Sequence, residues 1–433
     1  MRNYRWYLAA VLALGLAALA AVGTAGGAGE RQGVSGSVSI IAKWTGDEQA
    51  SFQAVLAPFK KANPGLKIKY TGAGDNVPQI VSTAIAGGNP PDIATLPQPG
   101  LMKQFAERGA AKPITFARGV IAKNYAPVWL SLGSVKGKLY GLFFKGANKS
   151  TVWYNVAAFK AAGVKAPATV AQLRQVAQTI KASGLPAYSI AGADGWTLTD
   201  LFENIYLRQA GGALYDRLSA HTIPWTHPSV KAALRTMALI IGDSDNILGN
   251  KSGALQTDFP TSVSNVFQNP AKAAMVIEGD FVPGVVASST KLKPISGYNV
   301  FPFPSVRPAT KASVMGGGDV VVMFKDNPAA RALISYLATP QAATIWAKRG
   351  GFSSPNKNVK PGAYSDALTR KTATGLAQAS LFRFDLSDLQ PAAFGSTAGQ
   401  GMWKLFQDFV EKPTDVNGIA AKLEASAAKA YKK

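Results

Sequence analysis

The chain of 433 residues contains no cysteine and only two histidines. The absence of cysteine excludes disulfide bonds, thiol catalysis, cysteine-ligated metal sites and a lipid-modified cysteine behind an export signal. HExxH is also absent, so the usual zinc-hydrolase helix is excluded. His221 and His227 are therefore expected to be surface or loop residues, and no metal is predicted.

Motifs for catalysis or nucleotide binding are missing too. No Gly-x-Ser-x-Gly elbow occurs. Gly141–Gly146 begins like a phosphate loop but continues with Ala-Asn instead of Lys-Ser/Thr, and Gly316–Gly318 precedes a strand instead of opening a helix. A glycosidase needs two carboxylates that face one bond, and the sequence does not bring Asp280 and Asp319 together. We therefore expect a protein that is not an enzyme and that carries no cofactor.

Only one long apolar run occurs, Leu8–Val22, which follows Arg2 and Arg5 and precedes a stretch of Gly and Ala. This order is typical of an export signal, here residues 1–28. A retained anchor is the alternative, because the uncharged stretch reaches Gly29. The sequence thus predicts an exported protein, in the periplasm or at the outer face of the cytoplasmic membrane.

Acidic residues are scarce: 24 against 46 basic ones, for a net charge of +22. The basic residues are spread along the chain and form no stripe interleaved with aromatics, so nucleic-acid binding is not expected. A positive field favours anionic ligands or lipid headgroups. The length and the 47% apolar content suit two domains with sizeable cores.

The first third of the chain alternates short apolar strands with amphipathic helices, which predicts a mainly parallel α/β sheet covered on both faces. Thr45 and Glu48 have the spacing of a capping box. Later segments repeat the pattern, with Asp200 expected to cap a helix that ends near residue 209. Strands are expected at 38–42, 66–70, 93–96, 151–154, 273–277 and 320–324, and helices at 45–62, 78–86, 101–108, 170–182, 200–209, 228–241 and from 327, 339 and 399 onward.

Fragments along the whole chain are similar to those of one family. They are Phe59–Gly65 with Ile68–Tyr70, Ala84–Ile93, Tyr140–Gly141, Trp153–Asn155, Phe159–Val164, Ala274–Phe281, Gly195–Asp200, Leu207–Arg208, Phe301–Pro304, Gly316–Asp319 and Arg383–Asp388. In this order they resemble the carbohydrate-type extracellular solute-binding proteins of ABC importers, and most of all the α-glucoside and maltose-binding-protein-like branch.

The resemblance implies a two-lobed periplasmic-binding-protein fold with about three crossovers and a central ligand cleft. Matching motifs place the crossovers near 145–149, 298–301 and 351–356. Lobe one is then expected to contain 29–145 and 302–350. Lobe two is expected to contain 148–297 and 355–433.

A sugar site combines aromatic plates for the ring faces with polar groups for the hydroxyls. Trp44, Trp196 and Phe281 are the aromatic candidates, although a tryptophan such as Trp44 suits a core equally well. Gly317 would let backbone approach the ligand, and Arg383 with Asp388 forms either a closing loop or a surface ion pair. The complete predicted set is Trp44, Asp47, Glu48, Gln98, Lys145, Asn148, Lys149, Trp196, Asp280, Phe281, Gly317, Asp319, Arg383 and Asp388.

From these observations the sequence predicts the carbohydrate-binding component of an ABC importer. It would capture an oligosaccharide or glycoside between its lobes and deliver it to membrane permease subunits, as a monomer. Three alternatives stay open: a secreted glycosidase, a binding protein for an acidic sugar or sugar phosphate, and an adhesin or surface scaffold.

Overall fold

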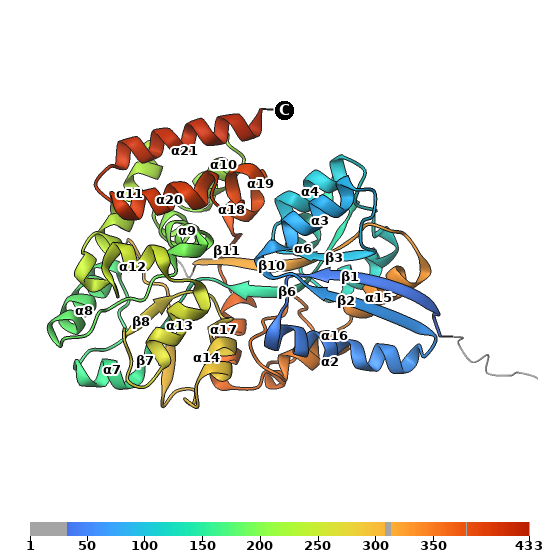
Figure 1. Ribbon diagram of the computed structural model, residues 1–433, viewed down its shortest axis with the longest axis horizontal. Helices are drawn as coiled ribbons and strands as arrows, with labels where there is room; N and C mark the ends of the chain where they lie inside the picture. Colours follow the sequence, from blue (N-terminus) through green and yellow to red (C-terminus); the bar gives the residue numbers. More distant parts are fainter. Residues whose placement is uncertain (1–32, 308–312, 378, 433) are drawn as a thin grey trace, which may run out of the picture.

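The computed structural model describes residues 33–307, 313–377 and 379–432, and the predicted signal at 1–28 lies outside these residues. Two halves lie side by side along the long axis of the molecule, with strands running between them (Figure 1). Each half has its own buried apolar cluster. We call the half with β1 lobe one and the half with β7 lobe two.

Lobe one is built on a six-stranded sheet in the order β11-β10-β3-β1-β2, with β6 also paired to β10. In β1, Val38, Ile40 and Ala42 are buried at every second position, as expected for a strand with one face on the core. The strands are β1 (Gly36–Ala42), β2 (Leu66–Gly72), β3 (Ile93–Leu96), β6 (Gly141–Asn148), β10 (Ser313–Met323) and β11 (Leu381–Phe384).

This sheet is mixed rather than mainly parallel. β1 pairs in parallel with β2 and β3, and β10 pairs in parallel with β11, but β10 is antiparallel to both β3 and β6. The prediction of a mainly parallel sheet holds for the first three strands alone, because β10 returns to this sheet from the other lobe.

Helices cover both faces of the lobe-one sheet (Figure 1). The helices are α2 (Gly46–Ala62), α3 (Val77–Ala86), α4 (Pro99–Glu107), α5 (Arg118–Asn124), α6 (Pro127–Leu132), α15 (Pro328–Leu337) and α16 (Pro340–Ala347). A short hairpin of β4 (Ser134–Val135) and β5 (Lys138–Leu139) lies beside them. The predicted helix starts at Asn327 and Thr339 are confirmed, since each side chain accepts a hydrogen bond from the third residue of its helix.

Lobe two is mostly helical around a three-stranded antiparallel sheet in the order β8-β7-β9. Its strands are β7 (Thr151–Asn155), β8 (Met275–Ile277) and β9 (Tyr298–Pro302). Its helices are α7 (Val156–Ala161), α8 (Val170–Ala182), α9 (Trp196–Ala210), α10 (Gly212–Ser219), α11 (Pro228–Ile241), α12 (Asn250–Gln256), α13 (Phe259–Phe267), α14 (Val282–Ser289), α18 (Leu386–Leu389), α19 (Ala392–Gly395), α20 (Gly401–Glu411) and α21 (Val416–Tyr431). A further helix, α17 (Ala367–Ala377), lies at the boundary, since its Ala373 packs in the lobe-one cluster and its Leu368 packs with Trp153 and Tyr298.

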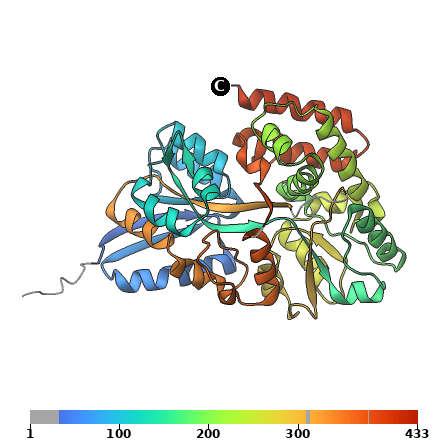
Figure 2. The same ribbon diagram turned by 180° about the vertical axis from the view of Figure 1, so that it is seen from behind.

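Three segments carry the chain between the lobes, and both ribbon views show β6 and β10 passing from one half to the other (Figure 2). The first passes from β6 to β7 near Lys149, as predicted. The second is β10 itself, because Met315 packs in the lobe-two cluster and Val320 in the lobe-one cluster. The third follows β11, where Phe384 belongs to lobe one and Leu386 to lobe two.

The division of the chain into lobes stays a prediction, and the packing differs from it in three places. Residues 298–301 do not cross between lobes, because β9 pairs with β7 inside lobe two. Phe303 and Met315 also belong to the lobe-two cluster, although the prediction placed 302–350 in lobe one. Conversely, Val359 packs in the lobe-one cluster although it falls within the predicted 355–433 segment of lobe two.

Two local predictions of helix caps were wrong. Thr45 precedes α2 but its side chain makes no capping bond. Asp200 lies inside α9, which begins at Trp196. Gly316–Gly318 were expected to precede a strand, and they are extended residues within β10 itself. Over the described ranges, none of the helices combines the length and apolar character that a membrane crossing requires.

Candidate ligand-binding cleft between the lobes

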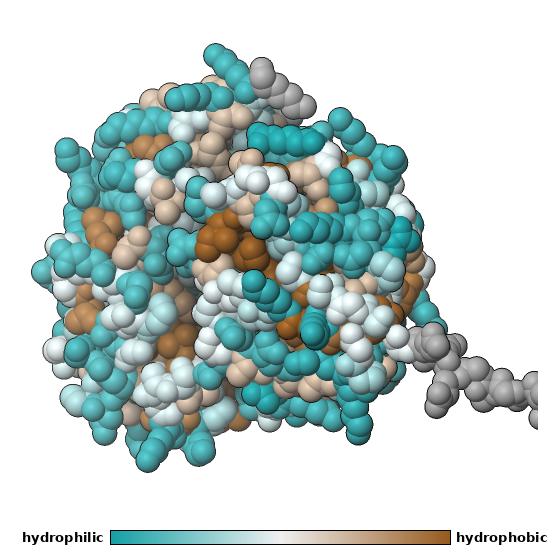
Figure 3. Space-filling view, turned by 45° about the vertical axis from the view of Figure 1, so that its right-hand side comes forward, coloured by the Kyte–Doolittle hydropathy of each residue, from teal (hydrophilic) through white to brown (hydrophobic). Residues whose placement is uncertain are grey.

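A cleft of about 1220 Å³ opens between the two lobes and is lined by residues of both. Figure 3 shows a furrow between the halves of the molecule, with apolar side chains along its walls. Lys43 and Gln98 reach it from the carboxyl ends of β1 and β3. Ligands of α/β sheets bind at this edge, so the fold itself places the cleft at the expected end of the strands.

The lobe-one wall carries two pairs of charged side chains that bind each other. Lys43 Nζ lies 3.3 Å from a carboxylate oxygen of Asp75, and Lys145 Nζ donates to Glu48. Burial alone would lower the pKa of Lys43, but the carboxylates of Asp75, Asp319 and Glu48 outweigh burial and raise it above the usual value. Lys43 is therefore a charged hydrogen-bond donor at the cleft surface.

Trp44 does not form a stacking platform in the cleft. Its side chain is fully buried against Phe52 and Trp346, with ring centroids 4.6 and 4.9 Å away. Its indole N–H donates to Asp319 over 2.6 Å. Trp44 thus orients Asp319 from behind the cleft wall, and the core alternative for this tryptophan is the one that the structure shows.

The lobe-two wall carries a group of three aromatic rings. The ring centroid of Trp196 lies 5.5 Å from that of Phe259 and 6.0 Å from that of Phe281. Lys149 Nζ lies 5.4 Å from the centroid of Trp196, and Lys43 Nζ of the opposite lobe lies 5.8 Å from it. Trp196 is thus an aromatic plate that meets charged groups from both lobes.

Several polar atoms at this cleft are buried without a hydrogen-bond partner among the described residues. They are Oε1 of Gln98, Nε1 of Trp196 and Nε1 of Trp403, and all three side chains line the cleft. Buried polar atoms are ordinarily paired, so such atoms call for a partner of their own. One acceptor and two donors fit a ligand that carries hydroxyl groups.

Lys149 is held at the base of the cleft by carboxylates of lobe two. Its Nζ lies 3.0 Å from Asp200 and 2.5 Å from Asp385. Both carboxylate side chains are buried, at 4% and 2% exposure. Burial lowers the pKa of Lys149, but Asp200, Asp385 and Asp388 together raise it well above the usual value, so the ammonium stays charged.

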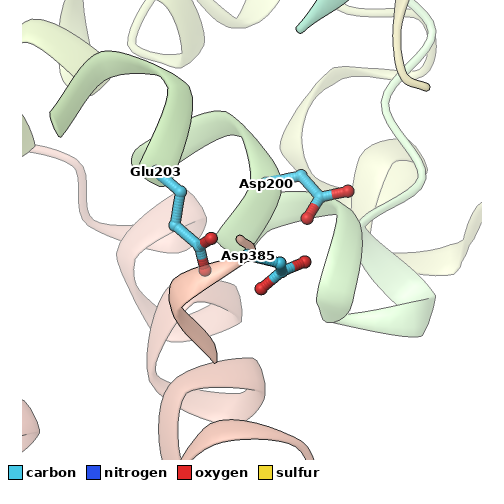
Figure 4. Close-up of side chains that lie close together, drawn as sticks. All are labelled: Asp200, Glu203 and Asp385. Carbon is cyan, nitrogen blue, oxygen red and sulfur yellow. The ribbon is translucent and has the colours of Figure 1, made fainter. Parts of the chain in front are cut away.

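Asp200, Glu203 and Asp385 point toward one another, the first two from α9 and the third from the turn before α18 (Figure 4). Burial, together with the charge of Asp385, raises the pKa of Glu203 well above its usual range. Burial likewise opposes ionisation of Asp385, but Lys149 outweighs it and lowers the pKa of that carboxyl. Burial raises the pKa of Asp200 well above its usual value too, so the single charge of Lys149 can balance these three acids. We therefore interpret the group as a network of ion pairs and hydrogen bonds and not as a metal site.

α9 binds all three segments that cross between the lobes. Asn204 donates to the backbone oxygen of Lys149 on the first crossing. Arg208 donates to the backbone oxygen of Ser313 on the second. Glu203 accepts the backbone N–H groups of Leu386 and Ser387 on the third, at 2.6 and 2.9 Å. One buried helix of lobe two therefore fixes the three connections and, through Asp200, the position of Lys149.

Nine of the fourteen predicted site residues line the cleft together. They are Asp47, Glu48, Gln98, Lys145, Lys149, Trp196, Phe281, Asp319 and Asp388. Asp388 is buried beside Lys149, and burial with the charge of Asp385 raises its pKa well above the usual range. The five other residues lie elsewhere.

Asn148, Asp280 and Gly317 support the crossings instead of the ligand. Asn148 donates to a backbone oxygen of α17 and accepts the N–H of Ser150. Asp280 accepts from Ser353, and burial raises the pKa of this carboxyl to about 6. A Cβ on Gly317 would lie 2.9 Å from Lys149, so this glycine leaves room for the lysine side chain.

Arg383 is a surface residue that does not meet Asp388. Its guanidinium makes a two-point contact with Asp216, at 2.6 and 2.8 Å. Both side chains are solvent-accessible. The surface ion pair is thus the correct alternative for Arg383, although with a partner on α10 that the sequence did not indicate.

The sequence missed several residues of the cleft because their partners are remote in the chain. Among them, Trp403 and Trp346 supply rings, and Lys43, Asp194 and Asp385 supply charges. Lys43 directly follows the first strand, as Trp44 does, so the strand-end rule could have found it. Trp403 lies on α20, and no motif connected it to the cleft.

The cleft is richer in acid than the chain as a whole. Nine of the 24 acidic side chains line it, against six of the 46 basic ones. The acidic residues are Asp47, Glu48, Asp75, Asp194, Asp258, Asp319, Asp366, Asp385 and Asp388, and the basic ones are Lys43, Lys145, Lys149, Lys291, Lys293 and Arg349. The strong positive charge of the protein therefore lies mainly outside the cleft.

Comparison with known sequences finds one family and full-length relatives. Residues 43–344 match the bacterial extracellular solute-binding protein family. The osmoprotective compounds-binding protein of Synechocystis is 32% identical over 379 residues, which are 86% of this chain and 88% of that protein. The alpha-glucosides-binding periplasmic protein of Rhizobium meliloti is 31% identical over 386 residues, 86% of this chain and 83% of the relative.

Solved structures share the fold at low sequence identity. A bacterial solute receptor, described as exclusively preferring β-D-galactopyranose, superposes with a TM-score of 0.81 at 19% identity, covering 92% of this chain and 99% of the receptor. A receptor of Streptomyces glaucescens, solved unliganded and with acarbose, gives a TM-score of 0.73 at 17% identity over 92% and 99% of the two chains. The two-lobed binding-protein fold is thereby confirmed.

Proposed function

The chain belongs to the bacterial extracellular solute-binding protein family, a family of receptors and not of enzymes, and on this premise we propose that its ligand is an uncharged glycoside or oligosaccharide. The protein is an exported component of an ABC importer, as the family is. It would bind the sugar between the lobes and deliver it to the permease subunits. That it acts as a monomer is part of the proposal.

The composition of the cleft walls carries the proposal. Trp196 and Phe281 offer ring faces for the apolar side of a sugar ring. Asp319 and Asp388 offer acceptors, and Lys43 offers a charged donor, for the hydroxyl groups at its edge. The buried, unpartnered oxygen of Gln98 requires a donor, and the indole N–H groups of Trp196 and Trp403 require acceptors. Sugar hydroxyl groups suit this set because each hydroxyl can both donate and accept. The alpha-glucosides named for the Rhizobium meliloti relative and the acarbose bound in the Streptomyces glaucescens receptor support the same class.

The charge of the cleft favours an uncharged sugar over an acidic sugar or a sugar phosphate. A phosphate group is commonly bound by free arginine or lysine side chains. Lys43, Lys145 and Lys149 are the lysines beside the rings of Trp196 and Phe281, and each is already paired with a carboxylate. The other basic side chains of the cleft, Lys291, Lys293 and Arg349, are not among the cations beside these rings. An anionic ligand would also meet Asp319 and Asp388, and the repulsion would weaken its binding.

Binding is expected to shift the protein toward a closed arrangement, because the ligand contacts Lys43 and Asp319 from one lobe and Trp196 and Asp388 from the other. A ligand that bridges both walls binds the closed state more tightly than the open one, which is what a population shift requires. The three crossings are the segments that would bend.

The test is titration calorimetry of the full chain against α- and β-linked glucosides, galactosides and their phosphorylated forms. We expect saturable binding of at least one neutral sugar and at least tenfold weaker binding of its phosphate. Trp196→Leu removes both the ring plate and the Nε1 donor, whereas the matched variant Trp196→Phe keeps a ring and removes only the donor. The first should therefore lose clearly more affinity than the second, whose loss should be about that of one hydrogen bond. The intact sugar should be recovered afterwards.

Two results would contradict the proposal. Tighter binding of the phosphorylated sugar would assign an anionic ligand, and equal affinity of the two Trp196 variants would remove the ring from the site. Hydrolysis of the sugar would instead favour the alternative that the protein is a secreted glycosidase.

A further inference from the structure

One end of lobe one carries a group of unpaired lysines, which we call the basic tip: Lys60, Lys61, Lys67 and Lys69. Lys60 and Lys61 lie in the last turn of α2, and Lys67 and Lys69 lie in β2 just after the connecting turn. All four are exposed. Among the residues that the structure describes, none of the four forms an ion pair with a carboxylate.

The sequence around the basic tip has no negative charge to neutralise it. No acidic residue occurs between Glu48 and Asp75, and none occurs between Asp326 and Asp366. The second stretch includes α15 and α16, which pack on α2: the ring of Tyr336 stacks on Phe59 at 5.1 Å, and its hydroxyl donates to a backbone oxygen of α2. Both stretches carry basic residues alone. Asp92 is a nearby acid, because it binds Ser39 in the strand beside Lys69, but the basic residues outnumber it and positive charge predominates at this end of lobe one.

The tip also forms the free border of the lobe-one sheet. β2 is the last strand in the sheet order, so one side of its backbone has no neighbouring strand within residues 33–307, 313–377 and 379–432. Lysines on an exposed border strand discourage pairing with other strands, and this accounts for Lys67 and Lys69. It does not account for Lys60 and Lys61, which lie on the helix beside it.

The described chain begins at this end of the molecule. Val34 N–H donates to Asn63 Oδ1 over 2.7 Å, and Gly36 N–H donates to the backbone oxygen of Gly65. Asn63 and Gly65 are in the turn between the two pairs of lysines. Val34 and Gly36 are therefore fixed directly beside the basic tip, and the apolar run Leu8–Val22 precedes them in the sequence.

We propose that the basic tip is a docking surface for anionic phospholipid headgroups, and that it holds this end of lobe one against the outer face of the membrane. Flexible lysine side chains suit a fluid layer of phosphates, to which juxtamembrane basic residues bind additively. The site lies outside the cleft and at the opposite end of β2, so it does not compete with the sugar. Binding of lipid headgroups is a role for part of the excess positive charge of the chain, most of which lies outside the cleft.

The test is co-sedimentation of the full chain with vesicles of phosphatidylcholine alone or with phosphatidylglycerol at three parts to one. Binding should require phosphatidylglycerol and should be lost between 50 and 500 mM salt, because the Debye length falls from about 13 Å to about 4 Å over this range. Replacing the four tip lysines by glutamine should weaken binding at least ~50-fold, since each lysine near an anionic surface contributes roughly a fivefold factor.

The matched control replaces four exposed lysines of lobe two by glutamine: Lys160, Lys165, Lys422 and Lys429. It changes the net charge equally and should leave vesicle binding within twofold of the unmodified chain. Insertion of the N-terminal apolar segment would be the same for every variant and would not require phosphatidylglycerol. Two results would overturn the proposal: an equal loss of vesicle binding in the two variants, or equal binding to vesicles with and without phosphatidylglycerol. Sugar affinity, measured in parallel, tests the cleft separately.

Discussion

Lys145 and Lys149 lie four residues apart on one crossing segment, yet each is held by a different lobe and in a different way. Lys145 pairs with Glu48 of lobe one, whose side chain is 36% exposed. Lys149 pairs with two carboxylates of lobe two that are almost completely buried. The comparison teaches that lobe two holds the crossings through buried charge, whereas the partner of Lys145 in lobe one can still be hydrated.

The largest expected effect comes from removing the charge of Lys149. Lys149→Met leaves Asp200 and Asp385 buried without a counter-charge, which should cost about 3–5 kcal/mol of the free energy of unfolding. Lys145→Met, the matched variant, should cost at most about 1 kcal/mol because water can reach Glu48. Urea denaturation of both variants measures the difference, and equal losses would show that the two lobes do not differ in this way.

The next effect is a dependence of stability on pH that arises from Asp280. Burial raises the pKa of this carboxyl from 3.8 to about 6 in the folded protein. Between about pH 4 and pH 6 the folded state therefore holds a proton that the unfolded chain releases. The contribution of Asp280 to the free energy of unfolding should rise as the pH falls through this window, by at most about 3 kcal/mol.

Asp280→Asn keeps an acceptor for Ser353 and removes the titration. When the pH is lowered from 7 to 4.5, the urea concentration at the midpoint of unfolding should consequently rise less for this variant than for the unmodified protein. An identical gain in both proteins would mean that Asp280 does not titrate in this range. Any increase in stability at low pH would then have to come from another buried carboxylate of lobe two.

A third comparison concerns the two walls of the cleft. Trp196→Leu on lobe two should weaken sugar binding by about 2 kcal/mol, or roughly 30-fold, as expected for an aromatic anchor. Gln98→Ala on lobe one removes a single neutral hydrogen bond and should cost about 1 kcal/mol, or roughly fivefold. Calorimetry with the sugar identified by the ligand panel measures both. A greater loss for Gln98 would move the main binding energy to lobe one.

The smallest effect is expected at Arg383, which shares lobe two with the buried network but lies outside it. Arg383→Gln breaks the ion pair with Asp216. The side chain of Arg383 is 32% exposed and that of Asp216 is 53% exposed. Such pairs contribute about 0–1 kcal/mol, so stability should hardly change. Sugar affinity should not change at all, and a measurable loss would return Arg383 to the binding site.

Local patterns in the sequence predicted most elements well. Helix 170–182 was placed at the bounds that α8 has, and Pro228 opens α11 as predicted. Caps, proline and apolar spacing act within a few residues, so they can be recognised in the chain itself. Positions at the ends of strands β1 and β3 likewise identified cleft residues such as Gln98.

Partnerships across long sequence distances escaped prediction. Trp44 and Asp319 are 275 positions apart, and Lys149 and Asp385 are 236 apart. Glu48 has the spacing of a capping box, but Lys145, 97 residues away, binds it instead. A motif shows which contacts a side chain can make locally, whereas a charged group at a lobe boundary is placed by whichever distant partner the fold brings beside it.

The attachment of all three crossings to α9 has a practical consequence for engineering. The segments that face the ligand from lobe one, including those with Asp47 and Gln98, are not bonded to this helix by any hydrogen bond within the described part of the chain. Grafting such segments from relatives should alter which sugar is captured and preserve the spatial relation of the lobes. Exchanging α9 without its three partner segments should instead break the hydrogen bonds that fix the crossings. In a chimaeric sensor, α9 and the three crossing segments should therefore all come from the same parent protein.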